Sequence, residues 1–293
     1  MTIRPRRSAL YMPGSNARAL EKARSLDTDV VIFDLEDAVA PSQKEVARAQ
    51  VLAAIKAGGY GRRELVVRIN GLSTPWGRDD LLAAASIGAH ALLLPKVASP
   101  GDLTRAAHEL TEAGISPDVR LWAMMETPMA VLNADSVVRT AVDPSARLDC
   151  LVMGTNDLVK DMRARLNKGR ASVLPLLATC VAAARAYGID IIDGVFGDLT
   201  DEAGLRAECE QGRDLGMDGK TLIHPGQISA ANEIFAPGED EVLWARKIVA
   251  AFADPAAKDA GVIALEGKMV ERLHEVMARR TLAIVEALAP SAN

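Results

Sequence analysis

Short apolar runs alternate with longer amphipathic stretches along roughly the first 235 residues of the chain. Turn-forming or polar residues bound each run, a pattern typical of strands that are buried on both faces of a parallel sheet. The predicted strands are 8–13, 30–35, 65–69, 91–95, 121–125, 148–153, 189–192 and 221–223.

Between these runs, apolar residues recur at the spacing of amphipathic helices. The predicted helices are 16–26, 42–57, 79–87, 102–113, 128–139, 173–187, 201–215 and 226–234, and 158–168 is predicted to be an active-site loop or short helix. Eight strand-helix units indicate an α/β fold of the (β/α)8 TIM barrel type. The alternative is a doubly wound open sheet, which would be large for one sheet and lacks a GxGxxG after its first strand.

The residues from Ala236 onward lie beyond the eight strand-helix units of the predicted barrel. They predict an amphipathic helix at 242–253, a polar link at 254–260, a short apolar run at 261–265 and a last helix at 270–289. We therefore divide the chain into a catalytic barrel, 1–235, and a C-terminal helical extension, 236–293.

The amino-acid composition indicates the kind of core and argues against several classes of protein. Apolar residues make up 49% of the chain but aromatic residues only 3%, so the core is built mainly from Ala, Val, Leu, Ile and Met. A net charge of -5 without a basic stripe argues against a nucleic-acid partner. The three cysteines have no metal spacing, so we expect them to be reduced and mostly buried. With no secretory signal and no run near the ~20 apolar residues of a membrane span, we expect a soluble, cytoplasmic protein.

Polar residues follow most of the predicted strands, and the carboxyl ends of barrel strands meet on one face. The residues at these ends are Asp34, Glu36, Asp37, Arg68, Asn70, Lys96, Glu126, Asp157, Asp193 and His224. This set holds six carboxylates against three cationic side chains. Crowded carboxylates repel one another unless a cation shares the site, and a hard divalent ion such as Mg2+ suits oxygen ligands. The alternative is an internal salt-bridge network with Arg68 and Lys96.

Three of these positions suggest particular roles. Glu126 ends the run in VRLWAMMETPMA, where a buried strand emerges into a loop, the position at which α/β folds keep catalytic groups. Arg68 is flanked by apolar residues, and its planar guanidinium suits a substrate carboxylate. Pairing with Asp34 or Glu36 is compatible with that role. In the turn Gly154-Thr155-Asn156-Asp157, backbone N–H groups can hold a substrate carboxylate while Asp157 meets the metal. His224 is a weaker candidate for a direct role.

Near the N-terminus, Arg18 and Lys22 lie four residues apart on a predicted helix and share a face. Two cations near a helix start can bind phosphate. The alternative is a solvated basic face.

Together these motifs resemble the citrate lyase beta-subunit-like family, which includes malyl-CoA and citramalyl-CoA lyases. The resemblance covers nearly the whole chain. It rests on RSALYMPGSNARALEKA, VIFDLEDAVAPSQKEVAR, VVRIN, LLLPKV, METPMA, GTNDL, GKTLIHPGQI and LEGKMVERLH.

The resemblance implies a Mg2+-dependent lyase, with Mn2+ as an alternative metal. Its substrate would be a 3-hydroxyacyl-CoA of the citryl-, malyl- or citramalyl-CoA type, cleaved to an acyl-CoA and a 2-oxo acid. The resemblance also implies a homotrimer or hexamer, in which the C-terminal segment acts as a lid over a neighbouring subunit's site.

Residue by residue, the resemblance implies Glu126 and Asp157 as metal ligands and Arg68 as the residue that holds the oxo acid. It implies that Asp37, together with Glu36, orders metal-bound water, and that Arg18 and Lys22 contact the CoA phosphates. The family's general acid/base is an aspartate, and Glu271 stands in its place here. Glutamate is one methylene longer with a similar pKa, so acid/base work survives while the balance between lyase and thioesterase stays open.

Three alternatives to the lyase therefore remain open at the level of sequence. The first is a thioesterase acting on the same thioesters through a metal-held water. The second is a metal-dependent aldolase acting on free oxo acids. The third is a catalytically silent barrel that binds CoA or an acyl-carrier protein.

Overall fold

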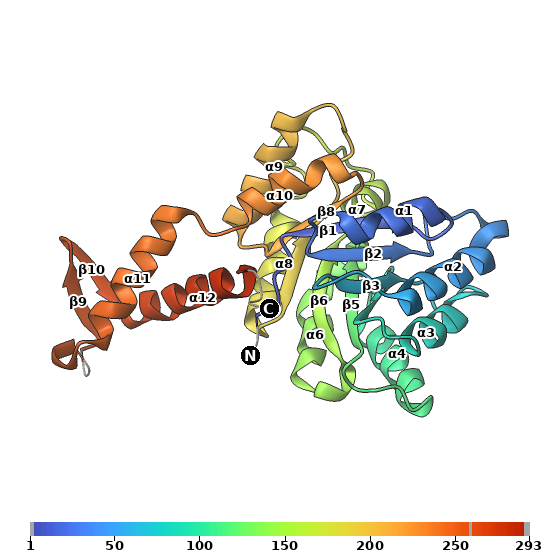
Figure 1. Ribbon diagram of the computed structural model, residues 1–293, viewed down its shortest axis with the longest axis horizontal. Helices are drawn as coiled ribbons and strands as arrows, with labels where there is room; N and C mark the ends of the chain where they lie inside the picture. The colour runs from blue at the N-terminus through green and yellow to red at the C-terminus, as the bar shows by residue number, and fades with distance from the viewer. Residues whose placement is uncertain (1–2, 258–259, 290–293) are drawn as a thin grey trace. The chain divides into compact units, whose positions relative to one another are not determined.

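The computed structural model describes residues 3–257 and 260–289, and the compact unit Arg6–Asn232 is a closed barrel of eight parallel strands (Figure 1). Each strand pairs with the next along the chain, and pairing of the first with the last closes the barrel. The strands are β1 (Ser8–Pro13), β2 (Val30–Asp34), β3 (Glu64–Arg68), β4 (Ala91–Leu94), β5 (Arg120–Met125), β6 (Leu148–Met153), β7 (Asp190–Asp193) and β8 (Gly219–Leu222). The predicted (β/α)8 barrel is confirmed.

Helices connect the strands and surround the barrel. They are α1 (Ala17–Lys22), α2 (Lys44–Ala57), α3 (Gly77–Ala85), α4 (Pro100–Glu112), α5 (Pro128–Leu132), α6 (Ala134–Arg139), α7 (Thr155–Asp161), α8 (Leu174–Ala186), α9 (Glu202–Leu215) and α10 (Ile228–Ile234). None of the described helices is both long and apolar enough to cross a membrane.

Two predicted helices differ from the observed ones. The predicted helix 128–139 is broken into α5 and α6 at Asn133, whose side-chain amide donates to the Ala98 carbonyl at 2.8 Å. The segment predicted to begin at 158 begins instead at Thr155. Thr155, Asn156 and Asp157 therefore form the first turn of α7 rather than an open loop.

The barrel interior is apolar in its middle. Inward-facing residues of most of the strands form one buried cluster: Ala9, Val30, Ile32, Val66, Ala91, Leu93, Trp122, Met124, Cys150, Val152 and Ile192. At the amino-terminal end, Arg6 is buried, pairs with Glu64, Asp149 and Asp190, and stacks on Trp122. All three cysteines are free and buried, as predicted.

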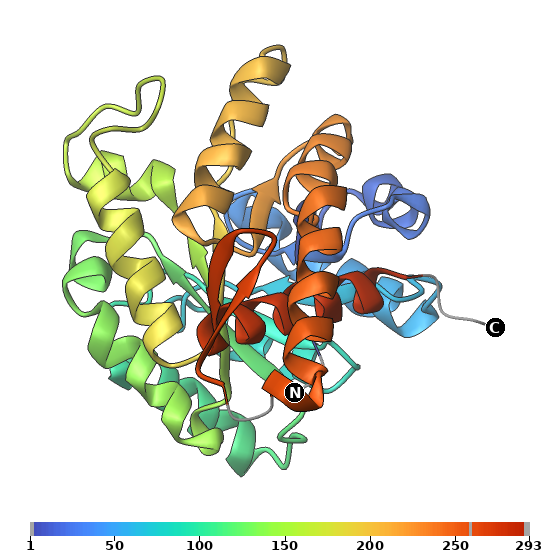
Figure 2. The same ribbon diagram turned by 90° about the vertical axis from the view of Figure 1, so that its left-hand side faces the viewer.

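Residues 3–5 and 233–289 of the described chain form a second compact unit. Its elements are α11 (Glu239–Ala253), β9 (Val262–Leu265), β10 (Lys268–Glu271) and α12 (Arg272–Leu288). Figure 1 and Figure 2 show α11 and α12 side by side, with the hairpin of β9 and β10 at one end of the pair. Ala245, Ile248, Phe252, Val270 and Ala278 form its core.

The predicted last helix, 270–289, begins too early. Val270 pairs with Ile263 in the antiparallel hairpin, so α12 starts at Arg272. Glu266 and Gly267 form the hairpin turn with φ of 49° and 77°, the left-handed backbone that such turns require. Glu271 is thereby the residue immediately before α12 rather than a residue within it.

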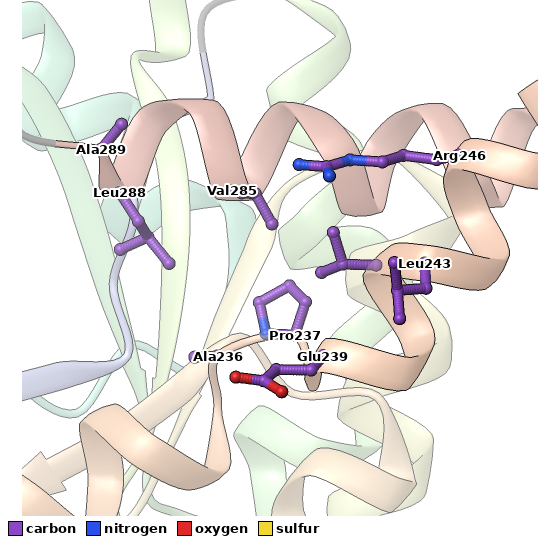
Figure 3. A pocket seen from close by; sticks show the side chains of 9 residues that line it. Ala236, Pro237, Glu239, Leu243, Arg246, Val285, Leu288 and Ala289 are labelled. Carbon is purple, nitrogen blue, oxygen red and sulfur yellow. The ribbon is translucent and has the colours of Figure 1, made fainter.

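An apolar groove of about 520 Å3 lies within this second unit (Figure 3). Val242 and Leu243 of α11 and Val285 and Leu288 of α12 line it, and Pro237 lies between them. The groove contains none of the site residues predicted from the sequence.

Candidate functional site

Glu126 follows β5 and is 1% exposed, although it carries a carboxylate. Its Oε1 accepts a 2.6 Å hydrogen bond from the backbone N–H of Lys96, which follows β4. To present that N–H, Lys96 adopts a left-handed backbone with φ of 53°, a conformation that costs a non-glycine residue free energy. The Lys96 side chain itself is exposed, so this residue contributes its backbone to Glu126.

Gly154, at the end of β6, leaves the space that Glu126 occupies. A Cβ on Gly154 would lie 2.3 Å from the Glu126 Cβ and 2.8 Å from its Oε2. The Gly154 N–H donates to the Met125 carbonyl at 3.1 Å, which fixes the two strand ends side by side. Only glycine fits at this position, so the glycine of the GTND turn is needed for the packing of Glu126.

Arg68 ends β3 directly opposite Asp34 of β2. Its Nε and Nη2 donate to the two Asp34 carboxylate oxygens at 2.7 Å each. Its Nη1 lies 3.1 Å from Glu36 and 3.3 Å from Asp37. The pairing of Arg68 with Asp34 or Glu36, which the sequence left as an alternative, is observed with both residues. Because Asp34 occupies the guanidinium fork, the role of Arg68 toward a substrate stays a prediction.

The loop after β2 holds Glu36 beside Arg68. The Asp34 carboxylate accepts the backbone N–H groups of Glu36 and Ala38 at 2.8 and 3.0 Å. Lys44 is buried and donates to the carbonyls of Leu35 and Glu36 at 2.9 and 2.7 Å. Sequence reasoning missed Lys44, because a lysine at the start of an amphipathic helix ordinarily faces water.

Two carboxyl groups in this site have strongly raised pKa values. Burial raises the pKa of Glu126 to about 7, against the lowering effect of the Lys96 N–H, and the charge of Asp157 raises it further. Burial likewise raises the pKa of Glu36 to about 7; Arg68 opposes this, and the charges of Asp37 and Glu126 add to it. The buried Oε2 of Glu36 is ion-paired with Arg68 Nη1 at 3.1 Å but, within the described residues, makes no hydrogen bond. The site therefore has an excess of negative charge.

Asp157 lies in the first turn of α7, partly exposed, with Lys160 at 2.8 Å. The first hydrogen bond of α7 runs from the Leu158 N–H to the Gly154 carbonyl, so the N–H groups of the first turn are not used within the helix. Thr155 is buried and Asn156 is exposed. Strand ends β5 and β6 thus bring Glu126 and Gly154 together, with Asp157 close enough to influence Glu126 electrostatically.

Other predicted strand-end residues have structural partners instead. Asp193 is fully buried between Arg170 and Lys220 at 2.7 and 3.1 Å. The Asn70 amide donates to Leu35 and Asp80. His224 is exposed, and its Nδ1 accepts the Gly226 N–H at 3.1 Å, which caps the turn after β8.

The remaining predicted site residues lie on α1 and in the second unit. Arg18 and Lys22 are exposed on α1, which Asn16 caps through its side chain. Glu271 belongs to the second unit, where its N–H donates to His274 Nδ1 at 2.9 Å.

The residues around Glu126 fit a hard divalent cation. Among the described residues, no group of three or more His, Cys, Asp or Glu side chains is arranged to hold a metal by itself. Mg2+ ordinarily takes one or two carboxylates and completes its coordination with water and substrate oxygens. Glu126 and Asp157 would be such a pair, and Glu126 Oε2 occupies the space that Gly154 leaves open.

Comparison with known proteins gives concordant matches. The family model described as HpcH/HpaI aldolase/citrate lyase matches residues 7–225. A (3S)-malyl-CoA thioesterase of Cereibacter sphaeroides (strain ATCC 17025 / ATH 2.4.3) is 49% identical over 285 residues, covering 97% of this chain and 96% of that relative. The citrate lyase subunit beta of Leuconostoc mesenteroides subsp. cremoris is 33% identical over 289 residues, covering 97% and 94%.

Among solved structures, one similar protein is CitE from Mycobacterium tuberculosis in complex with magnesium, acetoacetate and coenzyme A. It matches with a TM-score of 0.76 and 26% identity, over 98% of this chain and 100% of that one.

Proposed function

The chain belongs to the HpcH/HpaI aldolase/citrate lyase family, and from that premise we propose a Mg2+-dependent enzyme that hydrolyses the CoA thioester of a 3-hydroxy dicarboxylic acid. Family membership confirms the resemblance to citrate lyase beta subunits. The thioesterase 49% identical over nearly the whole chain supports hydrolysis, which was an alternative to the lyase at the level of sequence.

The observation that carries this proposal is the state of Glu36. Its buried Oε2 lies 3.1 Å from Arg68 Nη1 but makes no hydrogen bond among the described residues, and the carboxyl has a pKa of about 7. A general base works best when its pKa lies near the operating pH. Glu36 is therefore suited to take a proton from a water molecule.

The hydrolytic step follows from these groups. Glu36 Oε2 accepts a proton as the oxygen of water bonds to the thioester carbon. The C–S bond then breaks, and the same proton passes to the departing thiolate of CoA. Arg68 keeps Glu36 in place, and Asp37 helps to order the water. Glu126 and Asp157 would hold Mg2+, and the chemistry this ion supplies is Lewis-acid polarisation of a carbonyl.

Binding of the CoA moiety falls to other residues. Arg18 and Lys22 are exposed cations on one face of α1, and we propose that they contact the CoA phosphates. The CoA and magnesium bound by the M. tuberculosis protein support this expectation.

Carbon-carbon cleavage is the second candidate, favoured by the similarity to citrate lyase beta subunits. In that reaction Glu271 would accept the proton of the substrate hydroxyl.

We further propose that the C-terminal extension acts as a lid and oligomer contact in a homotrimer or hexamer. Support comes from four exposed apolar residues of β10 and α12, at 53–70% exposure: Met269, Leu273, Val276 and Met277.

An assay with malyl-CoA, citramalyl-CoA and citryl-CoA in parallel, detecting free thiol and oxo acid, tests the proposal. We expect free thiol without oxo acid, lost on removal of Mg2+ with EDTA. Oxo acid together with an acyl-CoA would establish the second candidate instead. Neither product from any thioester would favour a binding role or a carrier-protein substrate.

The role of Glu36 is tested in the same assay. Glu36→Gln should lower kcat by roughly 10²–10⁴-fold, the usual contribution of a general base. Glu210→Gln, on the exposed face of α9, is the control and should leave kcat unchanged. A Glu36→Gln variant with normal kcat would show that another group activates the water.

A further inference from the structure

Tyr11 lies above the apolar interior of the barrel, on the same side as the charged cluster. It comes from β1, one residue before Met12, and its ring packs against the buried inward-facing cluster. The Arg68 guanidinium lies 4.8 Å from the centre of that ring. The Tyr11 phenol also interacts electrostatically with Asp34, Glu36 and Glu126. The hydroxyl is thus close to the groups that we assign to chemistry.

The donors of Arg68 and the backbone N–H of Lys96 are already in use. Arg68 directs its Nε and Nη2 at Asp34 and its Nη1 at Asp37. The Lys96 N–H is taken by Glu126. Lys44 donates to the Leu35 and Glu36 carbonyls, Lys160 lies 2.8 Å from Asp157, and the carboxylates are acceptors when ionised.

Tyr11 supplies a side-chain donor beside Arg68, in addition to the unused N–H groups in the first turn of α7. In the part of the chain that the structure describes, no hydrogen bond of the Tyr11 hydroxyl is found. A ligand with a carboxylate requires donors that are not consumed by the protein's own acids.

We propose that the Tyr11 hydroxyl donates a hydrogen bond to an anionic oxygen of the acid half of the substrate. The inference rests on the proposed function and adds one substrate-contacting residue to it. The phenol ring meanwhile supports the guanidinium of Arg68 from one face. The two contributions are separable, because phenylalanine keeps the ring and removes only the hydroxyl.

The environment of Tyr11 suits a neutral donor. Burial raises the pKa of the phenol above its ordinary value, with Arg68 opposing and the neighbouring carboxylates adding to the rise. The hydroxyl therefore keeps its proton, and its role requires no change of protonation. Since a neutral donor adds no charge, it leaves the excess negative charge available to a cation.

The test measures binding of malate to the full-length protein by titration calorimetry in the presence of Mg2+. Tyr11→Phe should weaken binding by about 10- to 100-fold, the usual effect of losing a hydrogen bond to a charged group. Tyr11→Leu should weaken it further, because the support of Arg68 is lost as well.

Tyr60→Phe is the matched control. Its hydroxyl donates to the Leu20 carbonyl at 3.1 Å, and its ring meets Phe33 edge to face, so it is a buried tyrosine in a purely structural setting. This variant should lower the melting temperature and leave malate binding unchanged.

The outcomes separate the two proposals. If Tyr11→Phe binds malate within twofold of the wild-type affinity and keeps the wild-type melting temperature, the role of Tyr11 is wrong. The proposed function then still stands. If the unchanged protein neither binds malate nor turns over a thioester, the proposed function fails and the inference fails with it.

Discussion

Glu126 and Asp193 are both buried carboxylates at the carboxyl ends of barrel strands, yet their surroundings are opposite. Asp193 is matched: Arg170 and Lys220 contact it, and Glu208 balances the second positive charge. Burial by itself would raise the pKa of Asp193, but Lys220 and Arg170 outweigh it and hold the pKa low. Glu126 accepts a hydrogen bond from the Lys96 N–H; burial outweighs this bond and the charges of Arg68 and Lys96, and its pKa rises to about 7.

The difference distinguishes a structural acid from a functional one. A buried charge that is fully paired is satisfied by the protein and needs nothing further. A buried charge without a cation is satisfied only when a ligand supplies one, and perturbed pKa values gather at such sites. On this reasoning we propose that the cluster around Glu126 binds a metal, while the Asp193 network holds β7, β8 and the segment around Arg170 together.

The largest expected effect comes from Glu126→Gln. Loss of the carboxylate should lower Mg2+-dependent turnover by more than about 10³-fold, as expected when a bound metal ion no longer stabilises developing charge. The melting temperature in EDTA at pH 8 should stay the same or rise, because an unpaired buried charge has been removed. Activity close to that of the unchanged protein would contradict the metal assignment.

Asp193→Asn, in contrast to Glu126→Gln, should lower the stability of the fold. Removing one partner leaves Arg170 and Lys220 short of a buried counter-charge, which typically costs about 3–5 kcal/mol of unfolding free energy. Urea unfolding measures this loss. Asp198→Asn, at an exposed position after β7, is the control and should change the unfolding free energy little. If Asp193→Asn were as stable as its control, the contrast with Glu126 would disappear.

The smallest expected effect is on the pH dependence of stability through Glu36. Its folded pKa of about 7 lies above the ordinary glutamate value of 4.5, so the folded state binds the proton more tightly than the unfolded state. The resulting stabilisation is complete below pH 4.5 and is lost as the pH rises through 7.

In EDTA, Glu36→Gln should therefore flatten the fall in unfolding free energy between pH 5 and pH 8 by up to about 2–3 kcal/mol. Glu210→Gln should retain the slope of the unchanged protein. An unchanged slope in Glu36→Gln would mean that Glu36 is solvated like an ordinary surface acid.

The strands were predictable because burial on both faces leaves a strong local signal. β1 and β6 match the predicted bounds, and the other strands differ by one or two residues at either end. β10 was missed because Val270 fits either a hairpin or an amphipathic helix, and its pairing with Ile263 decided between them. The break at Asn133 was missed for a similar reason, because the acceptor of its side chain lies on the loop after β4.

The site was predictable only in part. The position of Glu126 at a strand end could be inferred from an apolar run that ends in an acid. Lys96 was expected as a cation, and its charge does lower the pKa of Glu126; its larger contribution is its backbone N–H, which depends on a left-handed φ that no side-chain pattern reveals. The sequence placed Asp193 in the same predicted set as Glu126. Its pairing with Arg170 could not be predicted, because Arg170 comes from a different segment of the chain.

The sequence by itself determined the barrel, the face on which its polar strand ends meet, and the family of the chain. These follow from periodicity and motif order, which are local properties. Tertiary structure alone decided which acids are neutralised: Asp34 by Arg68, Asp193 by Arg170 and Lys220, and neither Glu36 nor Glu126 completely. The physical reason is that the energy of a buried charge depends on what lies within a few ångströms, and those neighbours come from segments far apart in the chain.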